Sequence, residues 1–322
     1  MVLRTAFTER MSIRHPIALA PMGGSAGGRM AAAVSGGGGL GLIGAARGDR
    51  EWMEREVAIA RAATTAPWGI GLWTWGIDQE VVDRALAFRP DAVLLSFGDP
   101  TPYAESIRAA GAKLLLQVSE VDEARRAVDA GADVIIAQGG DHGGHGGRNP
   151  IGTMSFVPAV VDVAGETPVL AAGGIVDGRG LAAALALGAA GVLMGTRFQA
   201  SPEAILEPES VKALLAARSG DTDRNRVLDI ARGAAWPDLY PARTLRNEFL
   251  DDWRGREDEL RADDEAKQKY REAAARGDMG VIPVWAGQGV ELIRSVESAA
   301  DLVTTIVAEA ERAVARIGVR DS

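Results

Sequence analysis

The sequence contains no cysteine, which excludes disulfide bonds, a thiolate nucleophile and any zinc or iron–sulfur site that cysteine would bind. It also has no apolar run of the roughly 20 residues that a helix needs to cross a bilayer. Residues 1–10 lack the apolar core of a secretory signal peptide. We therefore predict a soluble, cytoplasmic protein.

Basic residues are in deficit, because 35 lysines and arginines stand against 44 aspartates and glutamates and leave a net charge of −9. This balance argues against nucleic acid or an anionic membrane as the main partner. The length of 322 residues suffices for one large domain, or for a barrel with an appended segment. A small molecule is the partner we expect.

Short apolar segments alternate with amphipathic, alanine-rich segments through the first two-thirds of the chain. The apolar segments have the composition of buried strands and lie at residues 17–20, 40–43, 69–73, 92–97, 113–118, 133–137, 168–172 and 191–194. Helical patterns separate them, at residues 26–35, 50–63, 79–88, 102–110, 121–130, 155–163 and 179–187. This repetition predicts a parallel (β/α)8 TIM barrel. An open doubly wound sheet is the alternative, but its Gly-x-Gly-x-x-Gly turn fits residues 22–27 poorly.

The composition changes after the barrel pattern. We assign residues 1–202 to the barrel and residues 203–289, which include a stretch rich in Arg, Asp and Glu, to a helical subdomain or lid over its mouth. An ordinary solvated helical extension is the alternative. Residues 290–322 carry apolar residues at helical spacing and are expected to pack back on the barrel as helices.

The loop at residues 138–147, Gln-Gly-Gly-Asp-His-Gly-Gly-His-Gly-Gly, follows the predicted sixth strand and holds two of the three histidines. Histidine is the side chain whose charge changes most readily near neutral pH. We expect one of His142 and His145 to act as acid or base and the other to support it; two structural histidines are the alternative. We expect no metal, because paired histidine ligands usually stand on a helix and this loop is too rich in glycine.

Glycine also follows the predicted seventh and eighth strands, as Gly173-Gly174 and as Gly195-Thr196. In a (β/α)8 barrel the active site lies at the carboxyl ends of the strands, and phosphate binds most often at these two turns. Glycine amides there form an anion site without lysine. The turns predict a phosphorylated ligand or cofactor, and tight packing is the alternative explanation for them.

Aromatic residues gather near the predicted ends of the third and fourth strands, where Trp68, Trp73, Trp75 and Phe97 lie. They are expected to form the wall of an apolar substrate pocket, unless they pack beneath helices.

Taken together and in this order, several motifs resemble the nitronate monooxygenase family, formerly called 2-nitropropane dioxygenases, over nearly the whole chain. They lie at residues 16–22, 33–43, 95–100, 138–146, 171–175, 194–196 and 285–293. The resemblance implies a (β/α)8 barrel with an added helical domain that binds FMN without a covalent bond. It also implies oxidation of alkyl nitronates or nitroalkanes with O2 to a carbonyl compound and nitrite.

The resemblance assigns roles to individual positions. His145 corresponds to the active-site histidine of the family. The residues that correspond to cofactor contacts, or lie among them, are Met22, Gly23, Gly71, Gln117, Gln138, Gly144, Gly173, Gly174, Gly195 and Thr196. Gly71 stands where relatives often carry Asn, and Gln117 stands where some carry Lys. His142 replaces a small residue and, with Trp73 and Phe97, is assigned to the substrate pocket.

Other activities fit the same residues. An FMN-dependent NAD(P)H oxidoreductase, of the quinone or enoyl-acyl-carrier-protein reductase type, is the main alternative, because such enzymes share the scaffold and the loop. A flavin-free phosphosugar isomerase or synthase is a second alternative, and a non-catalytic protein that binds FMN or another phosphate ligand is a third. A homodimer through the helical subdomain is also consistent with the sequence.

Overall fold

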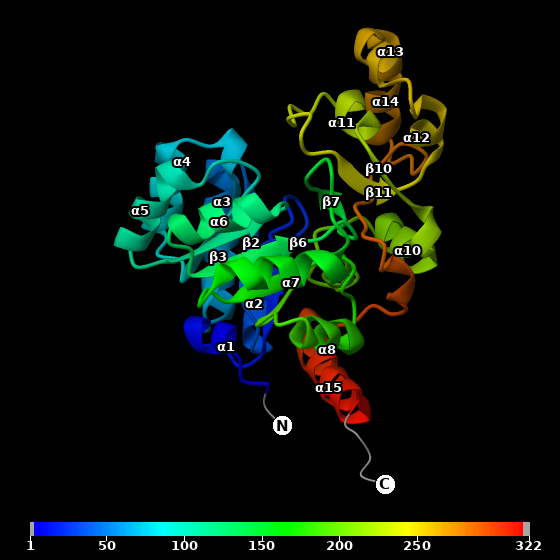
Figure 1. Cartoon of the computed structure of the whole chain (residues 1–322). Helices are drawn as coiled ribbons and strands as arrows, with labels where there is room; N and C mark the ends of the chain where they lie inside the picture. The colour runs from blue at the N-terminus through cyan, green and yellow to red at the C-terminus, as the bar shows by residue number, and fades with distance from the viewer. Residues whose placement is uncertain (1–2, 318–322) are drawn as a thin grey trace.

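A closed eight-stranded parallel barrel forms the centre of the computed structural model, which describes residues 3–317 (Figure 1). Its strands are β1 (Ile17–Leu19), β2 (Gly41–Ala46), β3 (Trp68–Trp73), β4 (Ala92–Ser96), β5 (Lys113–Val118), β6 (Val134–Gln138), β8 (Val169–Ala172) and β9 (Gly191–Met194). They pair in the order β1-β9-β8-β6-β5-β4-β3-β2. The barrel closes just before β2, where the amide of Leu40 donates to the carbonyl of Ile17 over 2.9 Å. The predicted (β/α)8 fold is confirmed.

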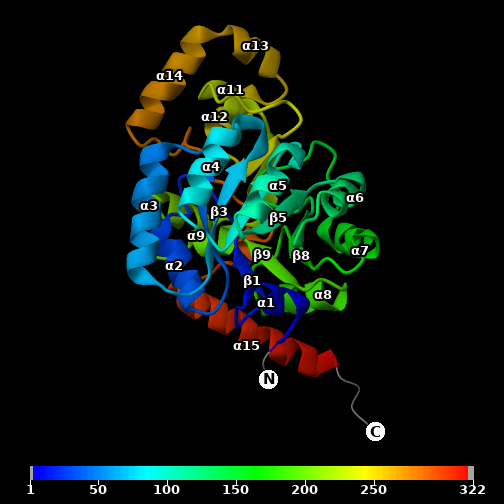
Figure 2. The ribbon, with the colours of Figure 1, turned by 90° about the vertical axis from the view of Figure 1, so that its left-hand side faces the viewer.

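Helices surround the strands. They are α2 (Gly28–Gly36), α3 (Arg50–Ala63), α4 (Gln79–Ala87), α5 (Thr101–Ala109), α6 (Val121–Asp129), α7 (Thr153–Ala164) and α8 (Gly178–Ala186). The ring is completed by α15 (Ala299–Ile317), which packs against both α8 and α2 and so takes the place of an eighth helix (Figure 2). The last described helix therefore lies against the first and the last helices of the ring. Residues 1–2 and 318–322, at the ends of the predicted segments, lie outside the described range.

The barrel strands are buried on both faces, which explains their continuous apolar sequence. In β6, Val134 and Ile136 belong to the cluster inside the barrel, while Ile135 and Ala137 belong to the cluster between strands and helices. Phe7, on the short helix α1 (Ala6–Met11), joins the inner cluster and fills the amino end of the barrel. The opposite, carboxyl end is thereby the one available for a ligand.

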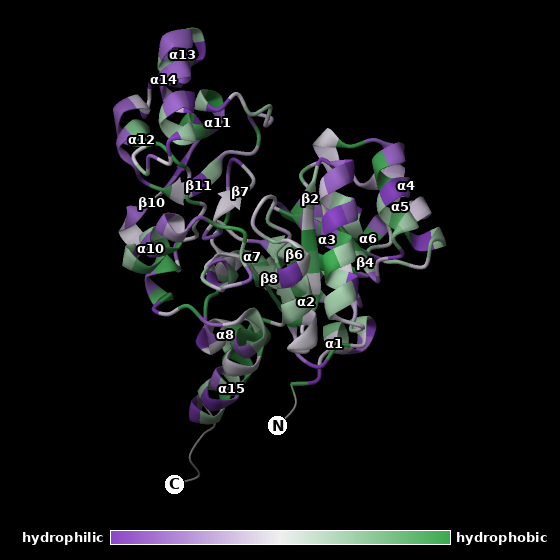
Figure 3. Cartoon of the chain, turned by 180° about the vertical axis from the view of Figure 1, so that it is seen from behind, coloured by the Kyte–Doolittle hydropathy of each residue, from purple (hydrophilic) through white to green (hydrophobic). Residues whose placement is uncertain are grey.

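A smaller unit stands at the carboxyl end of the barrel, and most residues of its helical segment 257–275 are hydrophilic (Figure 3). Its helices are α10 (Pro208–Ala216), α11 (Val227–Ala231), α12 (Glu248–Trp253), α13 (Glu257–Ala262) and α14 (Asp264–Ala275). The sequence predicts helices here. The unit also contains two paired strands, β10 (Thr222–Asn225) and β11 (Ala242–Leu245). A third strand, β7 (Gly144–His145), comes from the histidine loop and pairs with β11. No helix within residues 3–317 is long and apolar enough to cross a membrane.

Candidate active site

One cavity opens at the carboxyl end of the barrel, and residues at or near the ends of β1, β3, β4, β5, β6, β8 and β9 line it. About 1210 Å³ of space outside atoms lies within it, including solvent at its open mouth. The residues to which the family resemblance assigned roles all line it: Met22, Gly23, Gly71, Trp73, Phe97, Gln117, Gln138, His142, Gly144, His145, Gly173, Gly174, Gly195 and Thr196. Trp75, which was also expected from the sequence in the pocket wall, is not among the lining residues.

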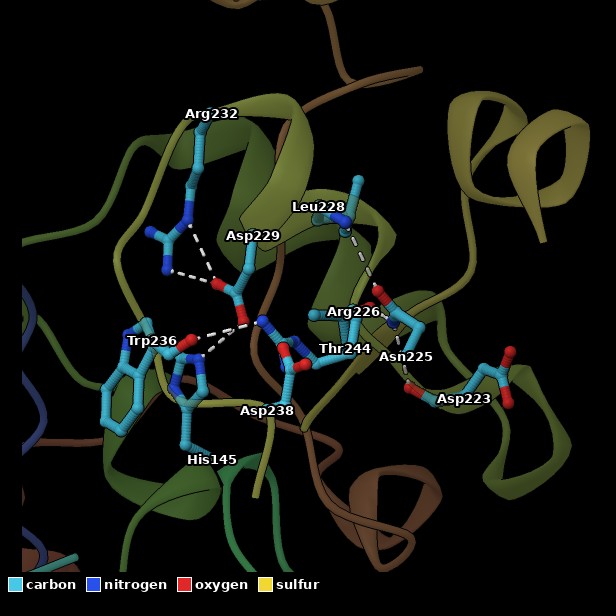
Figure 4. A network of polar contacts seen from close by, with 10 residues as sticks. All are labelled: His145, Asp223, Asn225, Arg226, Leu228, Asp229, Arg232, Trp236, Asp238 and Thr244. Atoms are coloured by element: carbon cyan, nitrogen blue, oxygen red, sulfur yellow. Dashed lines mark hydrogen bonds and ion pairs between the residues drawn. The ribbon is translucent and has the colours of Figure 1, made fainter. Parts of the chain in front are cut away.

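His145 is held between the two units of the chain. Its backbone lies in β7 and pairs with Ala242 of β11, while Gly144 before it adopts a positive φ of 69°. Its Nε2 lies 2.9 Å from Oδ2 of Asp229, on α11, and 9% of its side chain is exposed (Figure 4). Oδ1 of the same carboxylate accepts a 2.7 Å hydrogen bond from Arg232. His145, from the loop after β6, thus contacts the Asp229–Arg232 ion pair of the subdomain.

The protonation of His145 is set by opposing effects. Burial lowers the pKa of its imidazole, and the positive charges of Arg232 and Arg226 act in the same direction. The hydrogen bond to Asp229 and the negative charge of that residue raise the pKa, and the balance lies below the ordinary value. At neutral pH the ring is therefore uncharged and able to accept a proton.

His142 has a different environment, because both of its ring nitrogens are occupied. Its Nε2 lies 2.9 Å from an Nη2 of Arg224, and its Nδ1 lies 3.0 Å from the carbonyl of Gly143. An arginine can only donate, so Nε2 accepts and Nδ1 donates. Burial, together with the charge of Arg224, lowers the pKa of His142 to about 3. It lines the cavity as a neutral ring, and its polar atoms hold the loop.

Two glutamines present unsatisfied polar atoms within the cavity wall. Nε2 of Gln117 and Oε1 of Gln138 are buried without a hydrogen-bond partner, whereas Nε2 of Gln138 donates to the carbonyl of His145. Buried polar atoms normally have partners, so a donor and an acceptor left open beside a cavity indicate a polar ligand. This is the pattern that a planar heterocycle with both carbonyl and N–H groups would satisfy.

Glycines bring the backbone close to the cavity at the ends of β8 and β9. Gly173 and Gly174 adopt φ of 108° and 72°, a region that side-chain-bearing residues rarely occupy. Gly195 approaches Met22 so closely that an added Cβ would lie 3.2 Å from its sulfur. The sequence-predicted anion turns thus lie next to each other in space, since β8 and β9 are paired neighbours.

Aromatic rings form one side of the cavity. Trp73 and Phe97 are in contact with Trp236, with ring centroids 4.5 and 5.2 Å away, and Trp236 stacks on His145 at 3.5 Å with the planes 9° apart. Trp285 lines the cavity beside Arg232, whose guanidinium lies 4.9 Å from its ring centroid. Trp68 does not join this wall, because it begins β3 and therefore lies toward the other end of the barrel.

Sequence reasoning missed the residues that the subdomain contributes. Asp229, Arg232, Trp236 and Arg224 all lie in the polar segment that the sequence left without assigned roles. One signal was available: Asp229 is the only charged residue of the apolar stretch Val227–Ala231. A carboxylate on an otherwise buried helix requires a partner, and the partners here are His145 and Arg232.

Comparisons with known proteins identify the family of the chain. A family model described as nitronate monooxygenase matches residues 4–75 and 73–309. Nitronate monooxygenase npaC of Metarhizium robertsii is 36% identical, over 88% of this chain and 87% of the relative. FabK of Thermotoga maritima superposes with a TM-score of 0.86 at 31% identity, covering 98% of each chain. A nitroalkane oxidase of Streptomyces ansochromogenes gives 0.80 at 29% identity, over 98% of this chain and 100% of that one. The chain belongs to the nitronate monooxygenase family.

Proposed function

We propose that this protein oxidises alkyl nitronates with O2, that FMN is its cofactor and that His145 is the group that takes the substrate proton. As a member of its family it is a flavin-dependent oxidoreductase. The observation that carries the proposal is a neutral, buried imidazole, hydrogen-bonded to Asp229, in a cavity whose polar groups suit a flavin.

The residues of the cavity fit FMN in three respects. The open donor of Gln117 and the open acceptor of Gln138 match the carbonyl and N–H groups of the isoalloxazine ring. The backbone around Met22 and Gly23 offers a close approach to a flat ring. The turns at Gly173-Gly174 and Gly195-Thr196 suit the phosphate. Gly71 and Gly144 are the remaining residues of the proposed FMN site.

The proposed reaction converts one nitronate and half of an O2 molecule into one carbonyl compound and one nitrite, which balances atoms and charge. FMN, when bound, supplies the electron-accepting ring that this oxidation requires. His145 removes the α-proton when the substrate arrives as the neutral nitroalkane. Trp73, Phe97 and Trp236 exclude water from the reacting carbon, and His142 keeps the loop of His145 in place.

The test is the visible spectrum of the purified protein, recorded without oxygen before and after adding an alkyl nitronate. We expect a flavin spectrum that the nitronate bleaches and that O2 restores, with nitrite and carbonyl compound formed in equal amounts. A flavin that ignores nitronate but is bleached by NADH or NADPH would replace this proposal with the reductase activity. No flavin spectrum after reconstitution with FMN would overturn the cofactor assignment.

We further propose that residues 203–289 form a substrate lid on the barrel of residues 1–202, with residues 290–322 packing back on it. In support, the subdomain has its own apolar core, which includes Leu228, Leu250 and Tyr270. Its loop from Arg232 to Tyr240 supplies part of the cavity wall. A cytoplasmic location and a homodimer remain predictions.

Replacing Gly71 with asparagine, the residue that relatives often carry there, is expected to weaken FMN binding. A Cβ on Gly71 would lie 2.2 Å from Cβ of Pro21, so the wall that carries Met22 must move. Overpacking of this kind costs about 1–3 kcal/mol of stability. The measurements are the melting temperature and the FMN dissociation constant. Gly220→Asn is the control, since a Cβ there meets nothing within 4 Å. Tighter FMN binding by G71N would show that the lost polar contact matters more than the collision.

A further inference from the structure

The subdomain places one carboxylate against His145. Asp229 lies 84 positions further along the chain, and its side chain is 1% exposed. One oxygen faces Nε2 of His145 at 2.9 Å, and the other accepts hydrogen bonds from Nε and Nη2 of Arg232, at 3.3 and 2.7 Å (Figure 4). The carboxylate is thus fixed from both sides.

We propose that Asp229 is a positioning residue that holds His145 as the tautomer with its hydrogen on Nε2, so that Nδ1 is the atom that takes the α-proton of a neutral nitroalkane. This inference rests on the proposed function and deepens it, because it names the reacting atom and places its support in the subdomain. In the proton transfer the C–H bond breaks, its electron pair remains on the substrate as the nitronate, and an Nδ1–H bond forms.

The tautomer follows from the charge of Asp229. Burial alone would raise the pKa of its carboxyl group, but the hydrogen bonds and charges of His145 and Arg232 bring the pKa below its ordinary value. An ionised carboxylate can only accept hydrogen bonds, so Nε2 must donate. In neutral imidazole the other nitrogen then carries the free lone pair. Nδ1 has no hydrogen-bond partner within residues 3–317 and is not among their buried, unpartnered atoms, so it is open to the cavity that His145 lines.

The surrounding residues fix the ring and balance its charge. Trp236 stacks on the imidazole with the planes 9° apart, which prevents the ring from tilting. The charged and titratable groups that act on the site are Asp229, Arg232, Arg226 and His142, and His142 is neutral. Asp229 and Arg232 cancel each other, so the cluster becomes more positive when His145 takes a proton. That charge appears beside the nitronate anion that the same step creates and stabilises it.

The first test is Asp229→Asn, assayed with a neutral nitroalkane and with the preformed nitronate of the same compound. Loss of the positioning carboxylate should lower turnover of the neutral substrate by about 10²- to 10⁴-fold, the range set by general-base catalysis and by the same change in histidine–aspartate hydrolases. The preformed nitronate needs no base, so its turnover should stay near the wild-type value. Because Asp229 raises the pKa of His145, the acidic limb of kcat/KM for the neutral substrate should also move to lower pH.

Asp251→Asn is the matched control, because Asp251 pairs with Arg246 at the exposed surface of the same subdomain. It should leave both substrates and the pH profile unchanged. Equal losses on both substrates in D229N, with an unmoved acidic limb, would reduce Asp229 to a structural role and overturn the inference.

The second test reads the tautomer directly and needs no turnover. The chain has only three histidines, so ¹⁵N spectra of the imidazoles can be assigned with the His15→Gln and His142→Gln variants. We expect His145 in the wild-type protein to carry its hydrogen on Nε2 and to lose this preference in D229N. A wild-type His145 with hydrogen on Nδ1 would overturn the inference even if nitronates are oxidised. Failure of the wild type to oxidise nitronates would instead remove the proposed function and leave the tautomer result standing.

Discussion

Replacing His145 with asparagine is expected to lower kcat/KM for a neutral nitroalkane by about 10²- to 10⁴-fold, the range of a lost general base. Asparagine keeps a polar side chain but cannot take a proton near neutral pH, and its amide ends short of the position from which Nε2 contacts Asp229. The backbone carbonyl at this position, which accepts from Gln138, is unchanged by the substitution. FMN should therefore remain bound, as measured by the flavin absorbance per protein.

The preformed nitronate separates the two roles that the imidazole can have. If His145 acts only as a base, turnover of the preformed nitronate by H145N stays near the wild-type value. An equal loss on both substrates would mean that the imidazole stabilises the nitronate anion instead. His15→Asn is the control, since His15 precedes β1 at the other end of the barrel. Unchanged turnover of both substrates by H145N would remove His145 from the mechanism.

The barrel could be predicted from the sequence because its strands obey local rules. Each strand is buried on both faces, so it appears as a short apolar run, and the helices between them carry one apolar face. The residues around the cavity could be predicted for the same reason: the carboxyl ends of all parallel strands meet at one end of the barrel. Gln117 and Gln138 lie near the ends of different strands and still reach one cavity.

The strands of the subdomain could not be predicted from local sequence patterns. β10 has the sequence Thr-Asp-Arg-Asn, which has no apolar alternation, and β7 consists of two residues only. These strands exist because they pair with β11, a contact between segments up to 99 positions apart. Asp229 and His145 are also far apart in the sequence, at 84 positions. Neither this contact nor the pairing of β7 with β11 could be predicted from a local pattern.

A second large effect is expected at His142, on the pH dependence of stability. In the folded protein its pKa is about 3, because the ring is buried and faces Arg224, Arg243 and His145. In the unfolded chain the pKa returns to about 6.5. Between these values the unfolded state binds one proton more than the folded state, so stability falls as pH falls from about 6.5 toward 3. The loss from this residue is about 1.4 kcal/mol per pH unit, or on the order of 5 kcal/mol across the window.

Substituting glutamine for His142 should remove this dependence while keeping the contact, since a carboxamide oxygen can also accept from Arg224. Urea unfolding at pH 7, 6 and 5 would measure the free energy of unfolding of both proteins. The variant is expected to be somewhat less stable than the wild type at pH 7 and to approach or exceed it at pH 5, since Arg224 keeps its charge at every pH tested. His15→Gln should reduce the pH dependence of the free energy of unfolding less, because His15 is only half-buried. A stability difference between H142Q and wild type that stays constant with pH would mean that His142 is protonated in the folded state, and Nε2 could then not accept from Arg224.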